Sequence, residues 1–454
     1  MFEILKSILA KVEADYADIR HEMKLETRIV LNGNELSEIG TNRTDGYVLR
    51  VLNKGGLSSV AFTSADEHER AIRNVLESTH LMSRFTEQPV AFAKTTVVKD
   101  TYIPVLQEDP RQTMIDEKLQ LTRKYNNLIL HNKKIATTNI NYIELIRDKH
   151  YLSTEGSEIH EELVTTRISG LITSRDGNLL QNVRVAAGGS DGFAILRDRE
   201  AEFENKTRIA VDLLRAQPIK GGRHNAIINQ SLAGVFTHEA FGHFSEADII
   251  ENNHSMRQKM QIGAKLGNDI VSITDDPTQE HQLGHYKYDD EGVAARKTRL
   301  LENGVLVGRL HSRRSAAAFG EPLSGHCIAE DYRYAPIIRM GTIFIEPRNE
   351  TFEQMLSKLG NGFYILDAKG GQTSGENFTF GAQYAYEVKN GKLGEMVRDI
   401  NISGNLYSTL RNIQAVGNDL RLSQVGGCGK GQLNIRSCYG APHIIINNLI
   451  IGGK

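Results

Sequence analysis

The chain has 454 residues, of which 40% are hydrophobic and 24% charged, a composition typical of a globular protein long enough for two domains. Its formal net charge is −2 with both signs interspersed, which argues against binding to nucleic acid or to an anionic membrane surface. It has no run of about 18 apolar residues, and its N-terminus does not resemble a signal peptide, so we expect a cytoplasmic protein.

The first half of the chain mixes helical and strand patterns. Apolar residues at helical spacing predict a helix at the start, and further helices are predicted at 64–85 and 109–131. Between the first two helices, short β-type runs separated by turn signals predict a meander, and alternating apolar and polar residues at 134–185 predict more strands. The short runs are 18–22, 27–31, 46–52 and 57–61. This half is predicted to be α+β.

The second half has a different pattern. A charged helix is predicted at 198–216, followed by a strand at 225–229 and a helical segment at 237–243. Beyond about residue 258, many short β-like runs separated by glycine predict a largely antiparallel domain with the segment 237–243 packed on it. We therefore predict two domains, at 1–206 and 207–454.

Two imidazoles and a carboxylate lie close together in Thr237-His238-Glu239-Ala240-Phe241-Gly242-His243. In the zincin motif the histidines are four residues apart and share one helical face, and the Glu is the general base. Here the spacing is five, which on a regular helix would separate His238 and His243 by roughly 140°. The sequence therefore predicts a π-helical turn, and Gly242 is expected to tolerate unusual backbone angles there.

A catalytic zinc site also needs a third protein ligand and one open position. The three cysteines are an odd and sparse set, which argues against a disulfide framework. Cys428 lies in a glycine-rich turn beside Lys430, an environment that favours a thiolate. The spacing alone leaves Cys327, Cys438, Glu246 and Asp248 open as alternatives. A purely structural role for the histidines, and a buried apolar role for Cys428, also stay open.

Several separate blocks of the chain resemble the TldD/PmbA family of zinc metallopeptidases, and in particular its TldD branch, which carries HExxxH. The similar blocks are Tyr16 to Arg20, Gly46 to Val51, Gly55-Gly56, Thr237 to His243, Asp289 to Gly292, His311 to Arg314, Pro336 to Met340, Gly370 to Gln372, Ile402 to Asn405 and Val416 to Leu420. The resemblance implies that His238, His243 and Cys428 bind Zn²⁺ and that Glu239 is catalytic. The loop Cys428-Gly429-Lys430-Gly431-Gln432 is shorter than the family's.

The resemblance implies a metallopeptidase that hydrolyses unfolded peptides or small proteins by metal-activated water, with Glu239 as general base. It also implies a site enclosed in a dimer, either with a TldE/PmbA-like subunit or with a second copy. An extended peptide is expected to pair with a strand edge. His326, Tyr332 and Arg333 are considered as oxyanion donors. Two alternatives are a non-catalytic zinc-binding subunit and a zinc amidohydrolase acting on small amides.

Overall fold

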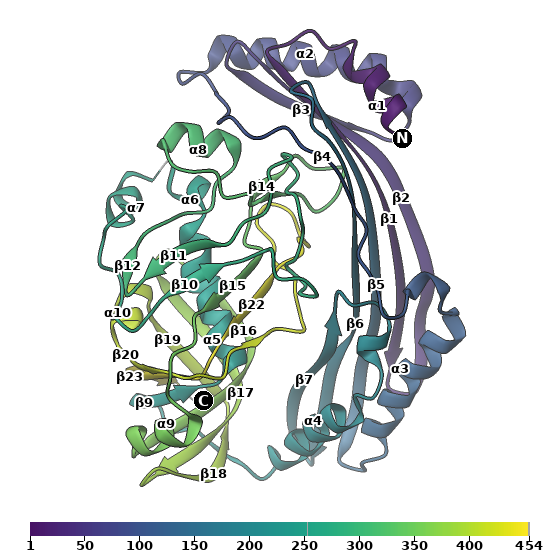
Figure 1. Ribbon diagram of the computed structural model, residues 1–454. Helices are drawn as coiled ribbons and strands as arrows, with labels where there is room; N and C mark the ends of the chain where they lie inside the picture. Colours follow the sequence, from purple (N-terminus) through teal and green to yellow (C-terminus); the bar gives the residue numbers. More distant parts are fainter. Residues whose placement is uncertain (252, 453–454) are drawn as a thin grey trace.

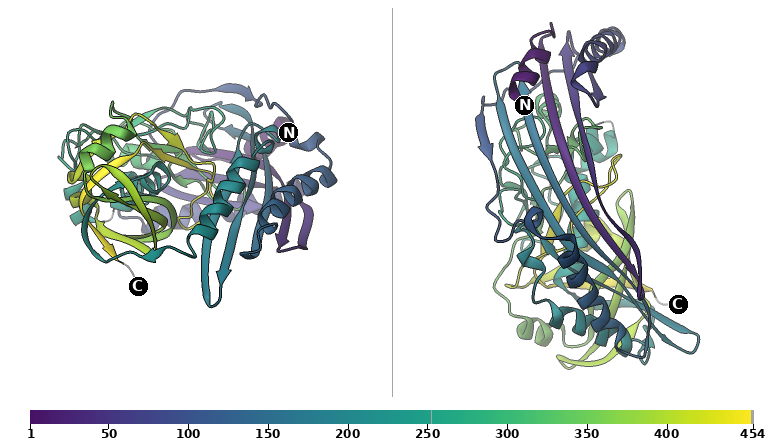
Figure 2. Two further views of the ribbon diagram at one scale, coloured as in Figure 1. Left: turned by 90° about the horizontal axis from the view of Figure 1, so that it is seen from below. Right: turned by 90° about the vertical axis from the view of Figure 1, so that its right-hand side faces the viewer.

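The computed structural model describes residues 1–251 and 253–452. Its fold class is α+β, as predicted. A curved sheet of long strands lies along one side of the molecule, and a domain of shorter strands and helices packs against the face that this sheet turns inward (Figure 1). Figure 2 shows that the long strands run most of the length of the molecule.

The N-terminal sheet has seven strands, in the order β3-β2-β1-β5-β6-β4, with β7 paired to β6. Two expected short runs, 18–22 and 27–31, are parts of one long strand. The Asp-Gly pair at 45–46 is one of the turn signals expected to separate the runs, but it lies within a strand. The polar residues between those runs stay extended because β2 and β5 pair with them on both sides. The strands are β1 (Tyr16–Asn32), β2 (Glu35–Asn53), β3 (Gly56–Phe62), β4 (Lys99–Tyr102), β5 (Ile135–Ser153), β6 (Glu158–Asp176) and β7 (Leu179–Gly189).

Helices cover this sheet at both ends. Near one end, α1 (Phe2–Leu9) and α2 (His68–Phe85) pack on β1, β2 and β3 around a core that includes Leu5, Ile19 and Val75. Near the other end, α3 (Ile115–Leu130) and α4 (Glu200–Asp212) form a second core with β5, β6 and β7. The helix expected from residue 109 begins later, because Asp109 and Pro110 form a separate short turn first. Three-residue 3₁₀ turns lie at Ala65–Glu67, Pro110–Gln112 and Ala194–Leu196.

The C-terminal domain is built on an eight-stranded and a six-stranded sheet, and α5 packs on β16 of the first and β22 of the second. The pairing is mostly antiparallel, as expected, with parallel pairs such as β9–β16 and β15–β22. Its strands are β8 (Gln217–Pro218), β9 (Gly222–Ile228), β10 (Ile273–Asp275), β11 (Thr298–Glu302), β12 (Val305–Leu306), β13 (Cys327–Ile328), β14 (Ile337–Ile338), β15 (Thr342–Ile345), β16 (Gly362–Ser374), β17 (Asn377–Lys389), β18 (Lys392–Arg398), β19 (Ile400–Asn405), β20 (Ile413–Val416), β21 (Arg421–Leu422), β22 (Cys438–Ala441) and β23 (Ile444–Gly452). Its helices are α5 (Gln230–Phe236), α6 (Ala247–Glu251), α7 (His254–Lys259), α8 (Arg313–Phe319), α9 (Phe352–Leu359) and α10 (Leu406–Arg411).

The expected domain boundary near Thr207 lies inside α4. Phe203 and Ile209, on either side of it, are both buried in the core that α4 shares with the N-terminal sheet. A helix packed as one unit is not divided between two domains, so we propose that the boundary follows α4, between residues 213 and 221.

Buried ion pairs join the inner face of the long sheet to the C-terminal domain. Arg50 lies 2.6 Å from Glu291, and Asp290 lies 3.1 Å from Lys149 and 3.5 Å from Arg20. Burial acts to raise the pKa of Asp290, but the cations around it, Arg20 first, hold that pKa below its usual range. Asp290 and Glu291 belong to the sequence block Asp289 to Gly292. Their ion pairs therefore hold the two domains together.

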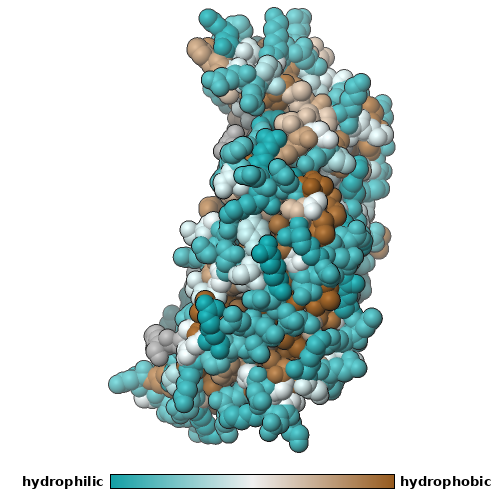
Figure 3. All heavy atoms as spheres, turned by 90° about the vertical axis from the view of Figure 1, so that its left-hand side faces the viewer, coloured by the Kyte–Doolittle hydropathy of each residue, from teal (hydrophilic) through white to brown (hydrophobic). Residues whose placement is uncertain are grey.

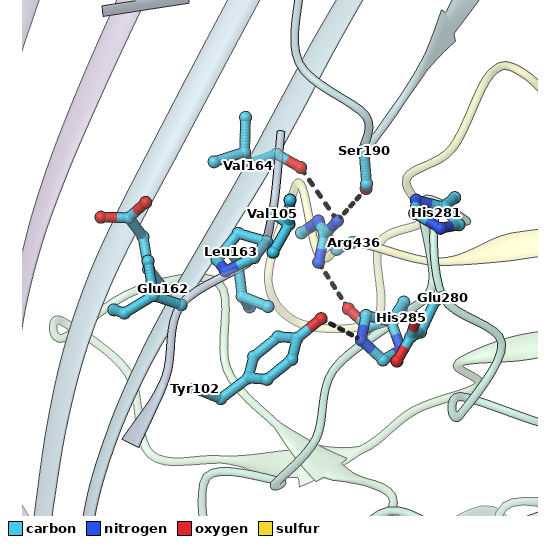
Figure 4. Close-up of a pocket in the computed structure, with 12 residues that line it drawn as sticks. Tyr102, Val105, Glu162, Leu163, Val164, Ser190, Glu280, His281, His285 and Arg436 are labelled. Carbon is cyan, nitrogen blue, oxygen red and sulfur yellow. Dashed lines mark hydrogen bonds between the residues drawn. The ribbon is translucent and has the colours of Figure 1, made fainter. Parts of the chain in front are cut away.

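A cavity of about 140 Å³ lies in the same seam, between β6 and the C-terminal domain (Figure 4). Arg436 lies at its wall and donates hydrogen bonds to the backbone oxygens of Val164 (3.2 Å) and His285 (2.6 Å). The Tyr102 hydroxyl lies 3.0 Å from Nε2 of His285. These polar groups bond to one another, so the cavity belongs to the packing of the domains.

In the part of the chain that the structure describes, no helix is long and apolar enough to cross a membrane. Figure 3 shows the side of the molecule away from the long sheet, where hydrophobic side chains form patches between hydrophilic ones. Exposed apolar residues of elements on this side include Ile249 in α6, Ile262 after α7 and Val307 after β12.

Candidate metal centre

The candidate centre begins on the segment that follows α5. Asn229 caps this helix by accepting a hydrogen bond from the backbone N–H of Leu232. The chain then forms a π-helical turn at Thr237–Phe241 and a 3₁₀ turn at Gly242–Ser245. The π-helical turn is confirmed, and it brings the rings of His238 and His243 to a centroid separation of 5.3 Å. The wider turn offsets the five-residue spacing.

The reason for a glycine at 242 differs from the expected one. Its backbone angles are those of an ordinary right-handed helix, φ −56° and ψ −47°. A Cβ atom at this position would lie 2.1 Å from the sulfur of Met340 and 3.1 Å from a methyl group of Ile343. Gly242 is therefore required for close packing against β14–β15, and not for an unusual conformation.

Four of the residues singled out from the sequence meet at this turn. One donor atom from each of His238, Glu239, His243 and Cys428 lies within 4.8 Å of the others. Sγ of Cys428 is 3.6 Å from Nε2 of His243, which is 3.5 Å from a carboxylate oxygen of Glu239. The helix segment and the cysteine are 185 residues apart in sequence, so the tertiary fold alone brings them together.

The other two cysteines lie elsewhere. Both are buried, and burial raises the pKa of the Cys438 thiol to about 12 and that of Cys327 well above its usual value. Neither belongs to the group of donors around His243. A buried thiol with a raised pKa stays protonated and is a poor metal ligand.

The pKa of the Cys428 thiol is shifted in the opposite direction from those of the other two cysteines. Burial acts to raise the pKa of its thiol, but the imidazoles of His238 and His243 and the charge of Arg339 lower it to about 5. Burial acts to lower the pKa of His243, yet its bonds to Cys428, Glu239 and Glu246 raise that pKa to about 11. The cluster thus favours a thiolate, which is the form that binds metals.

His238 is buried, with 2% of its surface exposed, and in the described part of the chain neither of its ring nitrogens has a hydrogen-bond partner. A buried polar group without a partner is costly. A cation bound by His238, His243 and Cys428 would give one of these two nitrogens a partner, and two imidazoles with a thiolate form a donor set that suits zinc. The residues present therefore fit the metal.

Glu246 and Asp248, two alternatives for the third ligand, hold the Cys428 loop instead. Lys430 lies 2.9 Å from Glu246 and 2.8 Å from Asp248, which ties the loop to the segment after His243. The second bond of Glu246 is to Nδ1 of His243, at 3.3 Å, so Nε2 of that ring faces Cys428.

Arg339 completes this arrangement and was not recognised as a site residue from the sequence. Its side chain is fully buried, and its guanidinium lies 3.3 Å from Glu246. Arg339 lies in the block Pro336 to Met340, and the resemblance of that block to the family was the feature of the sequence that could have identified it. A carboxylate that orients a ligand histidine is typical of zinc sites.

The three residues considered as oxyanion donors have structural contacts. His326 is buried, with one ring nitrogen 3.1 Å from Asp275 and the other 2.8 Å from the Ser324 backbone oxygen. Arg333 pairs with Asp331 at 2.5 Å. The ring of Tyr332 packs so closely on β2 that a Cβ at Gly46 would lie 2.3 Å from it.

Two family models match the chain. Residues 221–453 match the PmbA/TldA metallopeptidase C-terminal domain, and residues 17–82 match the PmbA/TldA metallopeptidase domain 1. A metalloprotease of Synechocystis sp. is 31% identical over 97% of this chain and 95% of its own length. A zinc metalloprotease TldD homolog of Saccharolobus solfataricus is 27% identical, with 100% of both chains covered.

Solved structures share the fold. TldE from Thermococcus kodakarensis matches with a TM-score of 0.79 at 18% identity, and 100% of both chains is covered. A Thermotoga maritima protein that is named for modulation of a DNA gyrase matches with a TM-score of 0.82 at 20% identity, again over 100% of both chains. At these identities the likeness concerns the fold only.

Proposed function

Because the chain belongs to the PmbA/TldD family of metallopeptidases, we propose that it is itself a zinc-dependent peptidase that hydrolyses extended, unfolded peptides. The observation that carries this proposal is the meeting of the Cys428 sulfur with His238, His243 and Glu239. A reactive thiol, two imidazoles and one partly exposed carboxylate in one cluster are the parts that this chemistry needs.

His238, His243 and Cys428 would hold the ion. When bound there, it would supply Lewis-acid chemistry, polarising a carbonyl oxygen and acidifying a water molecule. Glu246 keeps Nδ1 of His243 engaged, so that Nε2 is the nitrogen left for the ion. Lys430 fixes the cysteine loop through Glu246 and Asp248.

Glu239 is the general base in this proposal. Its side chain is 36% exposed, whereas that of His243 is 19% exposed. The nearby imidazoles and Arg339 outweigh its burial and lower the pKa of its carboxyl group, so the ionised form is available to accept a proton. It would take a proton from the attacking water and pass it to the departing amine.

The geometry favours this open arrangement over a closed structural zinc site. A structural site has four protein ligands. Glu246 and Asp248, the donors considered for a fourth position, are both bound to Lys430. Glu239 is the one further donor in the group, and its exposure leaves it accessible to a substrate.

The resemblance to the TldD branch implies a TldE-like subunit as the partner, and a second copy of this chain is the alternative; TldE from Thermococcus kodakarensis has the same fold as this chain. The exposed apolar residues Ile249, Ile262 and Val307 supply hydrophobic surface on the side away from the long sheet. Mass measurement of the purified chain, alone and after mixing with such a subunit, would distinguish the two. The cytoplasmic location stays a prediction.

The proposal is tested with Glu239→Gln, which keeps the size of the side chain but removes the base. The variant should bind zinc as the unaltered protein does and lose hydrolysis of unstructured peptides by about 10²–10⁴-fold, the usual contribution of a positioned acid–base group. Glu353→Gln, at an exposed position on α9, is the matched control. Unchanged peptide turnover in Glu239→Gln would refute the proposed base. Turnover of small amides but not of peptides would point to an amidohydrolase.

A further inference from the structure

Three histidines lie side by side on the long sheet, far along the chain from the candidate centre. His21 on β1 is directly opposite His150 on β5, and His150 is directly opposite His160 on β6. Cross-strand partners share a face. The rings of His150 and His160 are stacked, with centroids 4.0 Å apart.

This face is not the one that meets the C-terminal domain. The neighbouring residues Arg20 and Lys149 point to the other face, where they pair with Asp290. The histidine face is the one covered by α1, where Phe2 packs edge-on against His150 at 5.2 Å. The histidines therefore lie on the opposite side of the sheet from the candidate metal centre.

Asp148 adds a carboxylate to the group. It lies two residues before His150, so its side chain is on the same face. One of its oxygens is 2.8 Å from Nε2 of His160 and 3.4 Å from Nδ1 of His150. Ligands at zinc–nitrogen distances around a tetrahedral ion lie roughly 3.4 Å from one another. One donor atom from each of the three residues is within 4.8 Å of the others.

The surroundings suit a bound cation. Nδ1 of His150 and Nδ1 of His21 are buried and make no hydrogen bond with the described residues, and His21 itself is only 5% exposed. The side chains of Asp148 and His160 are 31% and 23% exposed, so an ion can enter from solvent. The N-terminal ammonium group also acts on His150 electrostatically, but less strongly than the carboxylate of Asp148, and Lys6 on α1 is paired with Glu158.

We propose that Asp148, His150 and His160 form a second metal site, which binds a divalent transition-metal ion of the Zn²⁺ type. Two imidazoles and a carboxylate are ligands that zinc accepts, and the site has no sulfur. Its ligands come from two adjacent strands, so a bound ion would link β5 to β6. The proposal is independent of peptidase activity.

The test uses the full-length chain, stripped of metal and then dialysed against Zn²⁺ or Co²⁺. The chain should bind two equivalents of Zn²⁺, and X-ray absorption should show one sulfur ligand for every two zinc ions. Saturation at one equivalent with one sulfur per zinc would overturn the proposal. Because this measurement needs no substitution in the cluster, it does not depend on the folding of a variant.

Substitutions then locate the second ion. Asp148→Asn keeps the shape of the side chain and should weaken one zinc site by more than the roughly 10–100-fold that loss of an outer-shell partner costs. The thiolate-to-cobalt absorption of the Cys428 site should stay unchanged. His131→Gln removes an exposed histidine on the same domain and should change neither site. If the double variant with both Asp148→Asn and His160→Gln still bound two zinc ions with unchanged affinity, the proposal would also be overturned.

Discussion

The two histidine clusters are assembled in different ways. The one at His238 and His243 depends on a π-helical turn and on a loop that arrives from 185 residues further along the chain. The one at His150 and His160 depends only on the register of neighbouring strands. The first is therefore sensitive to anything that moves the two domains or the loop, whereas the second is fixed once the sheet has formed.

The contact between the domains explains this difference. The Cys428 loop touches the long sheet where Arg167 on β6 donates a hydrogen bond to the backbone oxygen of Gly426, at 3.2 Å. Lys430 in the same loop pairs with Asp248 in α6, which follows the turns that carry His238 and His243. The Asp148 group has no residue of the C-terminal domain among its members. Substitutions that affect one cluster and spare the other test this comparison.

The largest effect is expected for Cys428→Ser. Loss of the thiolate should release the metal from the first cluster and lower peptide hydrolysis on the order of 10³-fold, because the ion supplies several kcal/mol of transition-state stabilisation. Zinc content and peptide turnover are the measurements. Cys438→Ser, at a buried cysteine outside the cluster, is the control, and equal losses in both variants would contradict the assignment.

Asp290→Asn should loosen the seam between the domains. Removing a buried charge that faces Arg20 and Lys149 leaves cations without their partner, at a cost of about 3–5 kcal/mol in the free energy of unfolding. Metal affinity should fall at Cys428 and stay the same at Asp148. Asp176→Asn breaks an exposed pair with Lys134 and should cost about 0–1 kcal/mol.

The same aspartate gives a pH dependence. Its pKa in the folded protein is below the usual value, so the stability that it contributes is fully present above the unfolded-state pKa of about 3.9. That stability is lost as the pH falls toward the folded-state pKa. The measurement is the free energy of unfolding, obtained with urea at several pH values across this acid range. It should fall less steeply with decreasing pH in Asp290→Asn than in the unaltered protein. An equally steep fall would mean that the cations do not hold Asp290 in its ionised form.

Glu246→Gln should have an intermediate effect. The amide can still approach Nδ1 of His243, but the charge that faces Lys430 and Arg339 is lost. Metal affinity or activity should fall about 10–100-fold, as is usual for partners that orient a ligand histidine. Asp248→Asn leaves Lys430 its bond to Glu246 and should have a smaller effect. A larger loss in Asp248→Asn than in Glu246→Gln would show that holding the Cys428 loop through Lys430 matters more than orienting His243.

The smallest effect is expected for Gly242→Ala, in which the new methyl group meets the sulfur of Met340. Overpacking of this kind costs about 1–3 kcal/mol in the free energy of unfolding. Gly40→Ala adds a methyl group on β2 with no heavy atom within 4 Å and should leave stability nearly unchanged. A neutral Gly242→Ala would mean that Met340 moves aside freely.

The sequence alone determined the parts of this protein that depend on local chemistry. The five-residue spacing of His238 and His243 required a π-helical turn, because a regular helix would point the rings apart. Alternating residues at 134–185 required strands. The sequence marked Cys428 as a candidate thiolate, but the groups that lower the pKa of its thiol, His238, His243 and Arg339, lie far away in sequence. Spacing also left the choice among three cysteines and two acids open.

Tertiary structure decided what depends on partners distant in sequence. The strand β1 stays extended through polar residues only because β2 and β5 pair with it on both sides. Gly242 is a glycine because Met340 packs against it. Glu246 and Asp248 became holders of Lys430 instead of ligands, since a carboxylate binds whichever cation the fold places beside it, and local sequence does not encode that neighbour.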